Sequence, residues 1–225
     1  MQYFLNGGRD ERGVLKSDDS LALYGRLNVK RVLFIVYALV EEAWQQRWQD
    51  SGPMVEIPQM ELKALTLYDT DPAAIAAALD WADFVYFPGG SQESLLKRIH
   101  ALSTYELLNQ KLASNTLKLL GGGSAGAMVM GGWCIIGHRT VNAVVAGLGY
   151  LPDYVIDSHF SERDRLPRLE AVLKDLPGIS GLGLDEDTAA LLSREGALQA
   201  VYGSGTVTVC GNTNKTYDQN HRFTS

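Results

Sequence analysis

The sequence predicts an α/β fold in which a mostly parallel central sheet carries helices on both faces, forming a three-layer sandwich. Strand, loop and helix alternate several times before Ser124, which is the pattern of a parallel sheet. The run from Arg31 to Tyr37 is almost entirely apolar and rich in β-branched and aromatic residues, as in a central strand buried on both faces. Three Gly-rich or polar turns follow predicted strands, at residues 6–8, 88–92 and 122–126. Sites in such sheets lie at the carboxyl ends of the strands, so we expect these turns to lie side by side.

Most of the chain divides into strands and helices at glycine, proline and polar boundaries. Asp71-Pro72 places a capping carboxylate before a proline at the first helical position, and Ser91 can cap the next helix. The predicted strands are residues 3–5, 31–37, 53–57 with a short extension at 65–67, 83–87, 117–120, 154–157 and 181–184, then antiparallel strands at 188–192, 198–202 and 206–209. The predicted helices are residues 15–27, 41–49, 71–79, 91–99, 104–113 and 165–176. Nothing divides the chain, so we expect residues 1–225 to form a single domain, with 211–225 as a polar, partly frayed tail.

The composition is that of an ordinary globular protein with a full hydrophobic core. Hydrophobic residues make up 46% and charged residues 20% of the chain. The 20 basic and 26 acidic residues give a net charge of −6 without any Lys/Arg block, which argues against nucleic acid or an anionic membrane as partner. Two cysteines, Cys134 and Cys210, make no disulfide framework. The first eight residues lack the features of a signal peptide, so we expect a cytoplasmic protein.

The stretch from Leu120 to Met128 has the features of a nucleophile elbow. Gly122-x-Ser124-x-Gly126 joins a predicted strand to a segment suited to a helix start, with the serine at the apex of the turn. Glycines on both sides permit the tight backbone angles. Free N–H groups at the helix start would favour an oxyanion. The alternative interpretations are a glycine-rich phosphate loop and a plain strand–helix turn.

A serine nucleophile needs a base to remove its proton and a third group to orient that base. The four histidines are His100, His138, His159 and His221. Only His159 follows a predicted strand, which would bring it to the sheet edge beside Ser124. His100 lies within a predicted helix, His138 in a turn and His221 in the polar tail. The alternative for His159 is a structural or capping role.

Two acidic residues can orient this histidine. Glu186, within an acidic triplet, directly follows the predicted strand at 181–184. Asp157 lies two residues before His159, on the same face of its strand. The choice between them stays open. With Glu186 as the acid, the chain order is Ser, His, acid, which differs from the order Ser, acid, His of the α/β-hydrolases.

The acidic residues around His159 could also be taken for a metal site, formed with Asp157, Glu162 and Asp164. A second histidine at the spacing of dedicated metal sites is missing. We therefore expect neither a metal nor another cofactor.

Five motifs together resemble peptidase family S51, the serine peptidases that include dipeptidase E and cyanophycinase. In chain order they are Phe87-Pro88-Gly89-Gly90-Ser91-Gln92, Gly123-Ser124-Ala125-Gly126-Ala127, Gly147-Leu148-Gly149, Asp157-x-His159-Phe160-x-x-Arg163-x-Arg165-x-x-Arg168-Leu169 and Gly183-x-Asp185-Glu186-Asp187-Thr188-Ala189. The resemblance covers most of the chain and implies a fold similar to the class I glutamine amidotransferase domain. Those relatives carry cysteine at the elbow, so Ser124 indicates peptidase chemistry. The chain departs from cyanophycinases at Ser158, where they have glutamine.

The resemblance also implies roles for residues of the site. Ser124 would be the nucleophile, His159 the base and Glu186 the orienting acid. The N–H groups of Gly90 and Ala125 would form the oxyanion hole. The expected substrate contacts are Gln92, Asp157, Arg163 and Arg165.

The arginines indicate a substrate that carries a carboxylate. Residues 163 and 165 differ by about 200° around a helix, so we expect one or two of Arg163, Arg165 and Arg168 in the cleft and another on the surface. Arginine binds carboxylates in a bidentate manner. We expect hydrolysis of short peptides, especially dipeptides with N-terminal aspartate, through an acyl-enzyme. The alternatives are an isopeptidase for β-aspartyl or cyanophycin-like links, a broader exopeptidase and a catalytically silent relative of the fold. A homodimer and a monomer are both open.

Overall fold

The structure is a computed structural model that describes residues 1–9, 13–51, 55–137, 141, 143–211 and 213–221. Its strands are β1 (Gln2–Asn6), β2 (Arg31–Ile35), β3 (Glu61–Leu65), β4 (Phe84–Phe87), β5 (Leu119–Gly123), β6 (Gly131–Ile136), β7 (Ala143–Ala146), β8 (Leu151–Ser158), β9 (Ser180–Leu184), β10 (Thr188–Leu192), β11 (Leu198–Gly203), β12 (Val207–Cys210) and β13 (Lys215–Tyr217). Its helices are α1 (Asp18–Arg26), α2 (Glu42–Ser51), α3 (Pro72–Trp81), α4 (Gln92–Ala101), α5 (Thr104–Ala113), α6 (Ala125–Met128) and α7 (Leu166–Lys174), with a short 3₁₀ turn, η1 (Val14–Lys16).

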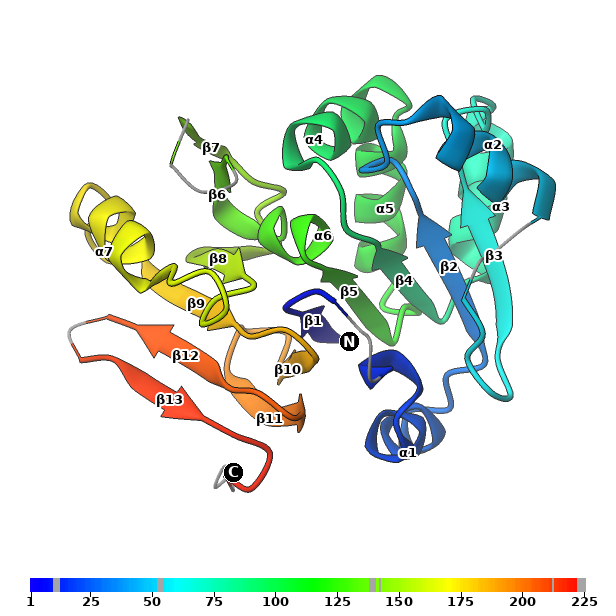
Figure 1. Ribbon diagram of the computed structural model, residues 1–225. Helices are drawn as coiled ribbons and strands as arrows, with labels where there is room; N and C mark the ends of the chain where they lie inside the picture. The colour runs from blue at the N-terminus through cyan, green and yellow to red at the C-terminus, as the bar shows by residue number, and fades with distance from the viewer. Residues whose placement is uncertain (10–12, 52–54, 138–140, 142, 212, 222–225) are drawn as a thin grey trace.

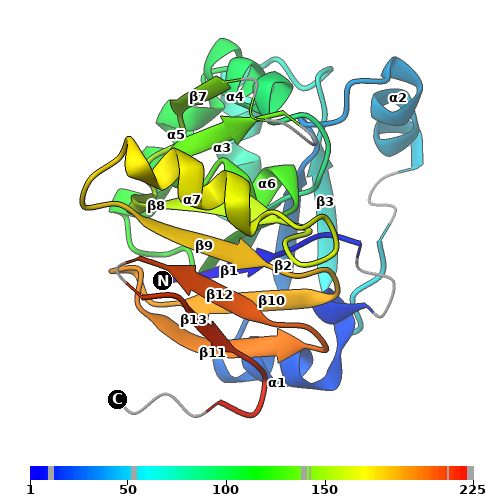
Figure 2. The ribbon, with the colours of Figure 1, turned by 60° about the vertical axis from the view of Figure 1, so that its left-hand side comes forward.

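The strands form two sheets (Figure 1). The first has the order β11-β10-β1-β5-β4-β2-β3, and its five strands from β1 to β3 run parallel. The second has the order β13-β12-β9-β8-β6-β7, with β6, β8 and β9 parallel. In Figure 2, α7 lies over the second sheet, where it contacts β8 and β9. The predicted α/β class and mostly parallel sheet are confirmed.

Alternation along the strands divides the first sheet between two helix layers. Successive strand residues point to opposite faces. In β2, Leu33 packs in the core on the side of α3, α4 and α5, whereas Phe34 packs in a second core with α1 and α2. In β4, Val85 and Phe84 divide in the same way. The apolar runs therefore mark strands buried on both faces, and the three-layer prediction is correct for this sheet. The first of these cores also contains residues of the second sheet, such as Val155.

Helix starts follow local capping rules. The Ser17 hydroxyl accepts a hydrogen bond from Ser20 N at 3.3 Å at the start of α1. Asp71 caps α3 ahead of Pro72, with Ala73 N donating to its carboxylate at 3.0 Å. Ser91 caps α4 in the same way, through Ser94 N. The predicted caps at 71 and 91 are confirmed.

Three local predictions are wrong or incomplete. The strand expected at 53–57 lies at 61–65, and the described part of the earlier stretch, residues 55–57, has no regular structure. Two strands, β6 and β7, were not predicted. The segment that contains β6, residues 131–137, is rich in glycine. The helix expected at 165–176 is confirmed as α7, with Arg165 as its N-cap residue, and residues 161–164 form a turn before it. Within the expected polar tail, Lys215–Tyr217 pairs with β12 as β13.

The carboxyl ends of three neighbouring parallel strands meet at one edge of the first sheet. β5 lies between β1 and β4, with Asn6 beside Gly123 and Phe87 beside Gly122. The turns that follow these strands are therefore neighbours, as predicted. Among the described residues, no helix combines the length and apolar character that crossing a bilayer requires.

Candidate active site

Ser124 lies at the apex of the turn between β5 and α6. Its backbone has φ 51° and ψ −117°, an unfavourable conformation for a residue with a side chain. Glycine is required on both sides. A Cβ on Gly122 would lie 2.4 Å from Gly126 C, and a Cβ on Gly126 would lie 1.9 Å from Phe87 O. The sequence thus folds here into the elbow that its spacing predicted, with the serine hydroxyl directed out of the turn.

Ser124, His159 and Glu186 form one hydrogen-bonded chain. Ser124 Oγ lies 2.8 Å from His159 Nε2, and His159 Nδ1 lies 2.7 Å from Glu186 Oε1. A carboxylate only accepts, so Nδ1 carries the proton in this pair and Nε2 is left to accept the serine proton. His159 comes from the end of β8 and Glu186 from the turn after β9. The arrangement can deprotonate a serine hydroxyl.

The environment of His159 keeps the ring neutral. Burial lowers the pKa of His159 from its ordinary 6.5, the hydrogen bond to Glu186 opposes this shift, and the charge of Arg163 adds to it. The His159 ring and the Glu186 carboxylate are mostly buried, with 8% and 15% of the side chains exposed. A neutral imidazole at neutral pH is the form that a general base requires.

Asp157, the other candidate for the acid, is turned away from His159. It is fully buried, and its carboxylate accepts from Arg165 Nη1 at 2.9 Å and from Arg168 Nε at 2.6 Å. The N–H of Ser158 also donates to it at 2.9 Å. Its oxygens are thus engaged by two arginines and a backbone amide. The described geometry therefore brings Glu186, and not Asp157, to the histidine.

The two backbone amides that were expected to bind an oxyanion belong to Ala125, next to Ser124, and to Gly90. Ala125 is the first residue of α6, so its N–H has no acceptor within the helix. Gly90 lines the same cavity as Ser124 and has φ 145°; a Cβ there would lie 2.3 Å from Ala38 O. No described residue accepts a hydrogen bond from either amide. Both remain available to a substrate carbonyl oxygen.

A cavity of about 310 Å³ opens beside Ser124 and His159. Gln92 and Glu93 line it from α4, with the Gln92 Nε2 atom 3.2 Å from Met128 Sδ. Arg163 and Arg165 line it from the turn before α7. Its remaining lining residues are Gly90, Ser91, Met128, Ile136, Gly137 and Ser158. The cavity therefore combines a cationic and an acidic group with the serine.

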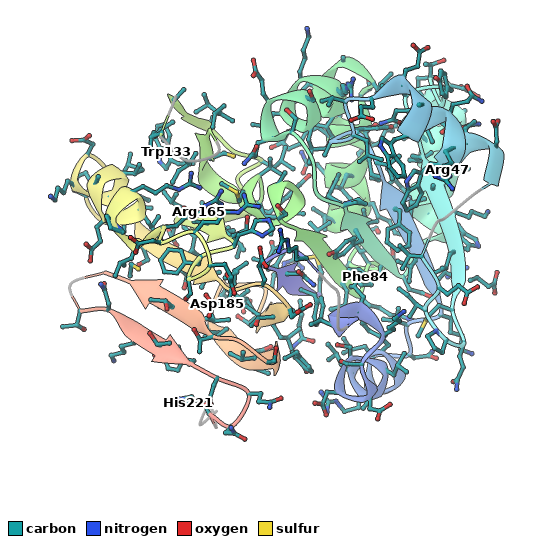
Figure 3. The ribbon with its side chains drawn as sticks, viewed as in Figure 1. Arg47, Phe84, Trp133, Arg165, Asp185 and His221 are labelled. Atoms are coloured by element: carbon teal, nitrogen blue, oxygen red, sulfur yellow. The ribbon has the colours of Figure 1, made fainter. Side chains whose placement is uncertain are left out.

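The arginines are arranged differently from the helical expectation. Arg163 precedes α7 and Arg165 is its N-cap residue, so helical spacing does not separate them and both line the cavity. Arg168, the arginine that does not line the cavity, has only 9% of its side chain exposed and binds Asp157, so it is not the surface arginine that was expected. Figure 3 shows Arg165 in the interior, beside α6. Two arginines reach the cavity, and the third helps to hold Asp157.

Sequence reasoning missed three features of this site. Glu93 lines the cavity but looked like an ordinary first-turn acid of α4. The Ser158 hydroxyl is buried, and no described residue forms a hydrogen bond with it. The turn at Asn6–Gly8 contacts all three loops of the Ser–His–Glu chain, a relation that only its Asn-Gly-Gly signature could have suggested.

The other histidines lie elsewhere. The His100 side chain is 52% exposed and lies 4.0 Å from Glu106. His221 is far from Arg165 in Figure 3. His138 falls outside the described residues. Within the described ranges, no group of three or more His, Cys, Asp or Glu side chains is placed to hold a metal ion.

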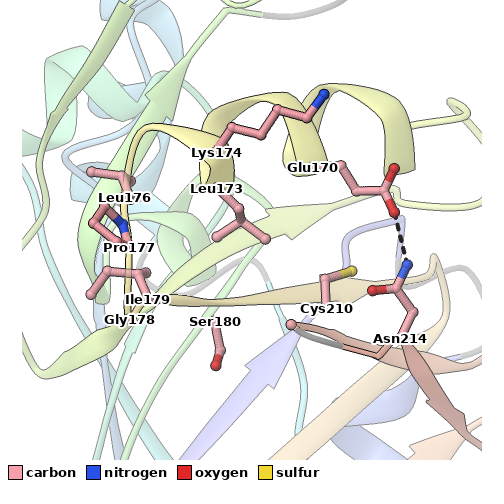
Figure 4. A pocket seen from close by; sticks show the side chains of 11 residues that line it. Glu170, Leu173, Lys174, Leu176, Pro177, Gly178, Ile179, Ser180, Cys210 and Asn214 are labelled. Atoms are coloured by element: carbon pink, nitrogen blue, oxygen red, sulfur yellow. Dashed lines mark hydrogen bonds between the residues drawn. The ribbon is translucent and has the colours of Figure 1, made fainter.

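A larger cavity, of about 560 Å³, lies between the end of α7, the start of β9 and the end of β12 (Figure 4). Glu170 accepts a hydrogen bond from Asn214 there, at 2.8 Å. Burial raises the pKa of the Cys210 thiol to about 11, so this sulfur is a poor nucleophile. The chemistry thus belongs to the smaller cavity at Ser124.

The sequence of this chain is similar to those of known proteins. The profile of peptidase family S51 matches residues 5–200. A cyanophycinase of Trichormus variabilis is 34% identical over 154 residues, which are 65% of this chain and 51% of that protein. A cyanophycinase of Synechococcus elongatus is 35% identical over 152 residues, 63% of this chain and 45% of that protein. The chain therefore spans about half the length of these curated relatives.

Solved structures show the same fold. A peptidase from an acI-B1 actinobacterium superposes with a TM-score of 0.71 at 22% identity, covering 98% of this chain and 95% of that one. A Listeria monocytogenes protein assigned to peptidase E gives a TM-score of 0.58 at 16% identity, covering 96% and 98%. At these identities the likeness concerns the fold alone.

Proposed function

The chain belongs to peptidase family S51 and is a serine peptidase, and we propose that it hydrolyses short peptides whose acyl residue is aspartate, above all dipeptides with N-terminal aspartate. The observation that carries this proposal is the Ser124–His159–Glu186 chain, which opens into a cavity lined by Arg163 and Arg165. A nucleophile beside fixed cations suits an acyl group that carries its own carboxylate.

The charges around the cavity support an acidic acyl residue. Two arginines, Arg163 and Arg165, and one carboxylate, that of Glu93, line the cavity. Arg168 and Asp157 form an ion pair outside this lining. Asp157 holds two of these guanidinium groups in place and has no exposed surface of its own, so its role in this proposal is to position the arginines. Arg163, which lines the cavity from the turn before α7, is the arginine that we assign to the substrate carboxylate.

Glu93 gives the cavity a group for the amino terminus. It lines the cavity from α4, whereas the arginines line it from the turn before α7. An N-terminal aspartyl residue carries both an ammonium group and a carboxylate close to the scissile carbonyl. Glu93 would bind the ammonium group and Arg163 the carboxylate, so that the acyl residue is held at both of its charges.

The reaction follows from these positions. Ser124 Oγ attacks the scissile carbonyl while its proton passes to His159 Nε2, and Glu186 stabilises the imidazolium that forms. The Gly90 and Ala125 N–H groups donate to the oxyanion. The imidazolium then gives its proton to the leaving amine as the C–N bond breaks, leaving an ester on Ser124. Water, deprotonated by His159, hydrolyses this ester and regenerates the serine.

A dipeptide panel tests the proposal. The peptides Asp-Leu, Asn-Leu, Glu-Leu and Ala-Leu are assayed with the wild type and with Ser124→Ala. Because hydrogen bonds to charged groups contribute about 1.5–3 kcal/mol, Asp-Leu should exceed Asn-Leu in kcat/KM by about 10- to 100-fold. Ser124→Ala should be inactive. Equal rates on Asp-Leu and Asn-Leu would instead favour a broader exopeptidase.

The role of Arg163 has its own matched control. Arg163→Gln should lower kcat/KM for Asp-Leu and leave kcat/KM for Asn-Leu unchanged, because only Asp-Leu has a side-chain carboxylate that Arg163 can bind. Arg47→Gln removes an exposed arginine on α2, on the opposite side of the molecule from Arg165 in Figure 3. It should change neither rate. If Arg163→Gln left the preference for aspartate intact, the assignment of the carboxylate partner would be wrong.

A second candidate is hydrolysis at β-linked aspartyl residues, and the similarity to two cyanophycinases favours it. The same arginine could bind the carboxylate of a β-aspartyl unit. Isoaspartyl-leucine and cyanophycin, assayed beside Asp-Leu, separate the two candidates. Faster cleavage of the β-linked substrates would replace the first proposal by the second, and inactivity toward all three would reject both.

A further inference from the structure

One short turn binds all three loops that carry the Ser–His–Glu chain. This turn, Asn6–Gly8, follows β1 at the carboxyl edge of the first sheet. Asn6 O accepts from Ser124 N at 3.0 Å, Gly7 O from His159 N at 2.9 Å, and Gly8 O from Asp187 N at 3.1 Å. Three consecutive carbonyl groups therefore bind the nucleophile, the base and the residue that follows the acid.

The turn also joins the two sheets at this point. Ser124 follows a strand of the first sheet, whereas His159 and Glu186 follow strands of the second. Gly7 N donates to Thr188 O at 2.9 Å, and a Cβ on Gly7 would lie 1.9 Å from Asp185 O. The turn is thus packed directly on the loop that carries the acid. Its conformation sets the spacing between residues of different sheets.

The Asn6 side chain fixes this conformation. It is 1% exposed, and its Oδ1 accepts from Gly8 N at 2.6 Å. Gly8 has φ 105°, and a Cβ there would lie 2.4 Å from His159 Cε1 and 2.6 Å from Nε2. The backbone at Gly8 therefore lies against the edge of the imidazole ring that faces Ser124. A movement of Gly8 would therefore change the packing against this edge of the His159 ring.

We propose that Asn6 is a positioning residue of the catalytic apparatus. Its Oδ1 holds Gly8 against the His159 ring, and this contact keeps Nε2 in line with Ser124 Oγ while Nδ1 remains on Glu186. Only the acceptor is used, because Asn6 Nδ2 has no hydrogen-bond partner among the described residues. Aspartate, which supplies the same acceptor, should therefore replace Asn6 functionally, whereas alanine should not.

The test measures the reactivity of Ser124 without any peptide. The inference rests on the catalytic chain of the proposed function, and labelling by a fluorophosphonate reports that chain whatever the substrate is. Because misplacement by about 1 Å can lower a rate about 10²-fold, Asn6→Ala should label about 10- to 100-fold more slowly than the wild type. Asn6→Asp should label within about threefold of it. Ser124→Ala should not label.

Stability is controlled separately. Thr104→Val removes a different buried hydrogen bond, between Thr104 Oγ1 and Tyr37 Oη at 3.1 Å, outside the lining of the cavity. It should lower the melting temperature and leave the labelling rate unchanged, so a loss of stability alone does not explain a loss of rate. All variants are compared at a temperature where thermal scans show them folded.

The outcomes are decisive in either direction. Wild-type labelling by Asn6→Ala, or equal losses in Asn6→Ala and Asn6→Asp, would overturn the inference. If Asn6→Ala does not fold, Asn6→Asp still tests it. A carboxylate bound to the N–H of Gly8, which packs against the ring, should raise the pKa of His159 and shift the acid limb of labelling to higher pH. An unshifted limb would contradict the placement. Absence of labelling in the wild type would instead reject the proposed serine mechanism.

Discussion

Replacing Glu186 by glutamine tests the catalytic chain at its most informative contact. The substitution keeps the size of the side chain but removes the negative charge that faces His159 Nδ1. The amide can donate to Nδ1 as well as accept from it, so the ring can adopt the tautomer with its proton on Nε2. In that tautomer, His159 cannot accept the proton of Ser124.

The magnitude follows from the geometry. His159 Nδ1 and Glu186 Oε1 are 2.7 Å apart, and both side chains are mostly buried. An effective dielectric constant of about 20 gives an attraction of about 6 kcal/mol between the imidazolium and the carboxylate. Because about 1.4 kcal/mol corresponds to a factor of ten, kcat should fall by about 10⁴. Replacing the acid of another serine triad by its amide has an effect of about this size.

The assay is the rate of fluorophosphonate labelling at neutral pH, with peptide hydrolysis measured beside it. Glu195→Gln is the control, because it removes an exposed carboxylate from the turn between β10 and β11. It should label at the wild-type rate. Retention of more than about a tenth of the wild-type rate by Glu186→Gln would refute the assignment of the acid. The assignment of Glu186 as the acid would also be refuted if Asp157→Asn lost the labelling rate while keeping its stability.

Three further predictions concern pH, a buried ion pair and the elbow. Burial lowers the pKa of His159 from 6.5, and the charge of Arg163 lowers it further. The labelling rate should therefore fall to half its maximum only below pH 6.5, where the ring becomes protonated and can no longer act as a base. Arg163→Gln should move this limb to higher pH in a pH–rate profile, and a move to lower pH would contradict the account. Asp157→Asn leaves buried guanidinium groups without their carboxylate, so the free energy of unfolding measured in urea should fall by about 3–5 kcal/mol. An unchanged free energy of unfolding would contradict the ion-pair role. Gly126→Ala places a Cβ 1.9 Å from Phe87 O and should lower both the melting temperature and activity, whereas an equally stable and active variant would argue against the elbow geometry.

The fold was largely predictable because its central strands carry their signal locally. In β2 and β4, apolar residues on both faces predict burial on both faces, and Asp71-Pro72 predicts the start of α3. β3 was misplaced because it is an edge strand with exposed Glu61 and Lys63, so its burial alternates instead of being continuous. β6 begins with two glycines, so its β-branched residues, Ile135 and Ile136, lie only at its end and give a weak strand signal.

The division into two sheets could not be predicted, because it depends on pairing between distant segments. The predicted antiparallel strands exist, but β10 and β11 join the first sheet whereas β12 joins the second. Local patterns predict that a segment is a strand and not which strand it pairs with. The same limit explains why the polar stretch 215–217 was not recognised as a partner of β12.

The candidate site was predictable where one residue follows one strand. Ser124, His159 and Glu186 each lie in the turn that follows a predicted strand, and the structure brings them into hydrogen-bonding distance. The expected helical separation of Arg163 and Arg165 was wrong because the helix begins only after both. The contacts of the Asn6–Gly8 turn involve backbone carbonyls, which leave no mark on residue identity.

The central claim is that Ser124 takes up the acyl group of an aspartyl substrate. An activated aspartyl ester, mixed with the enzyme and quenched in acid within the first turnovers, should add the mass of one aspartyl group. Peptide mapping should locate it on the segment containing Ser124, and Ser124→Ala should carry none. Rapid hydrolysis with the adduct on another residue, or undiminished turnover by Ser124→Ala, would contradict the account.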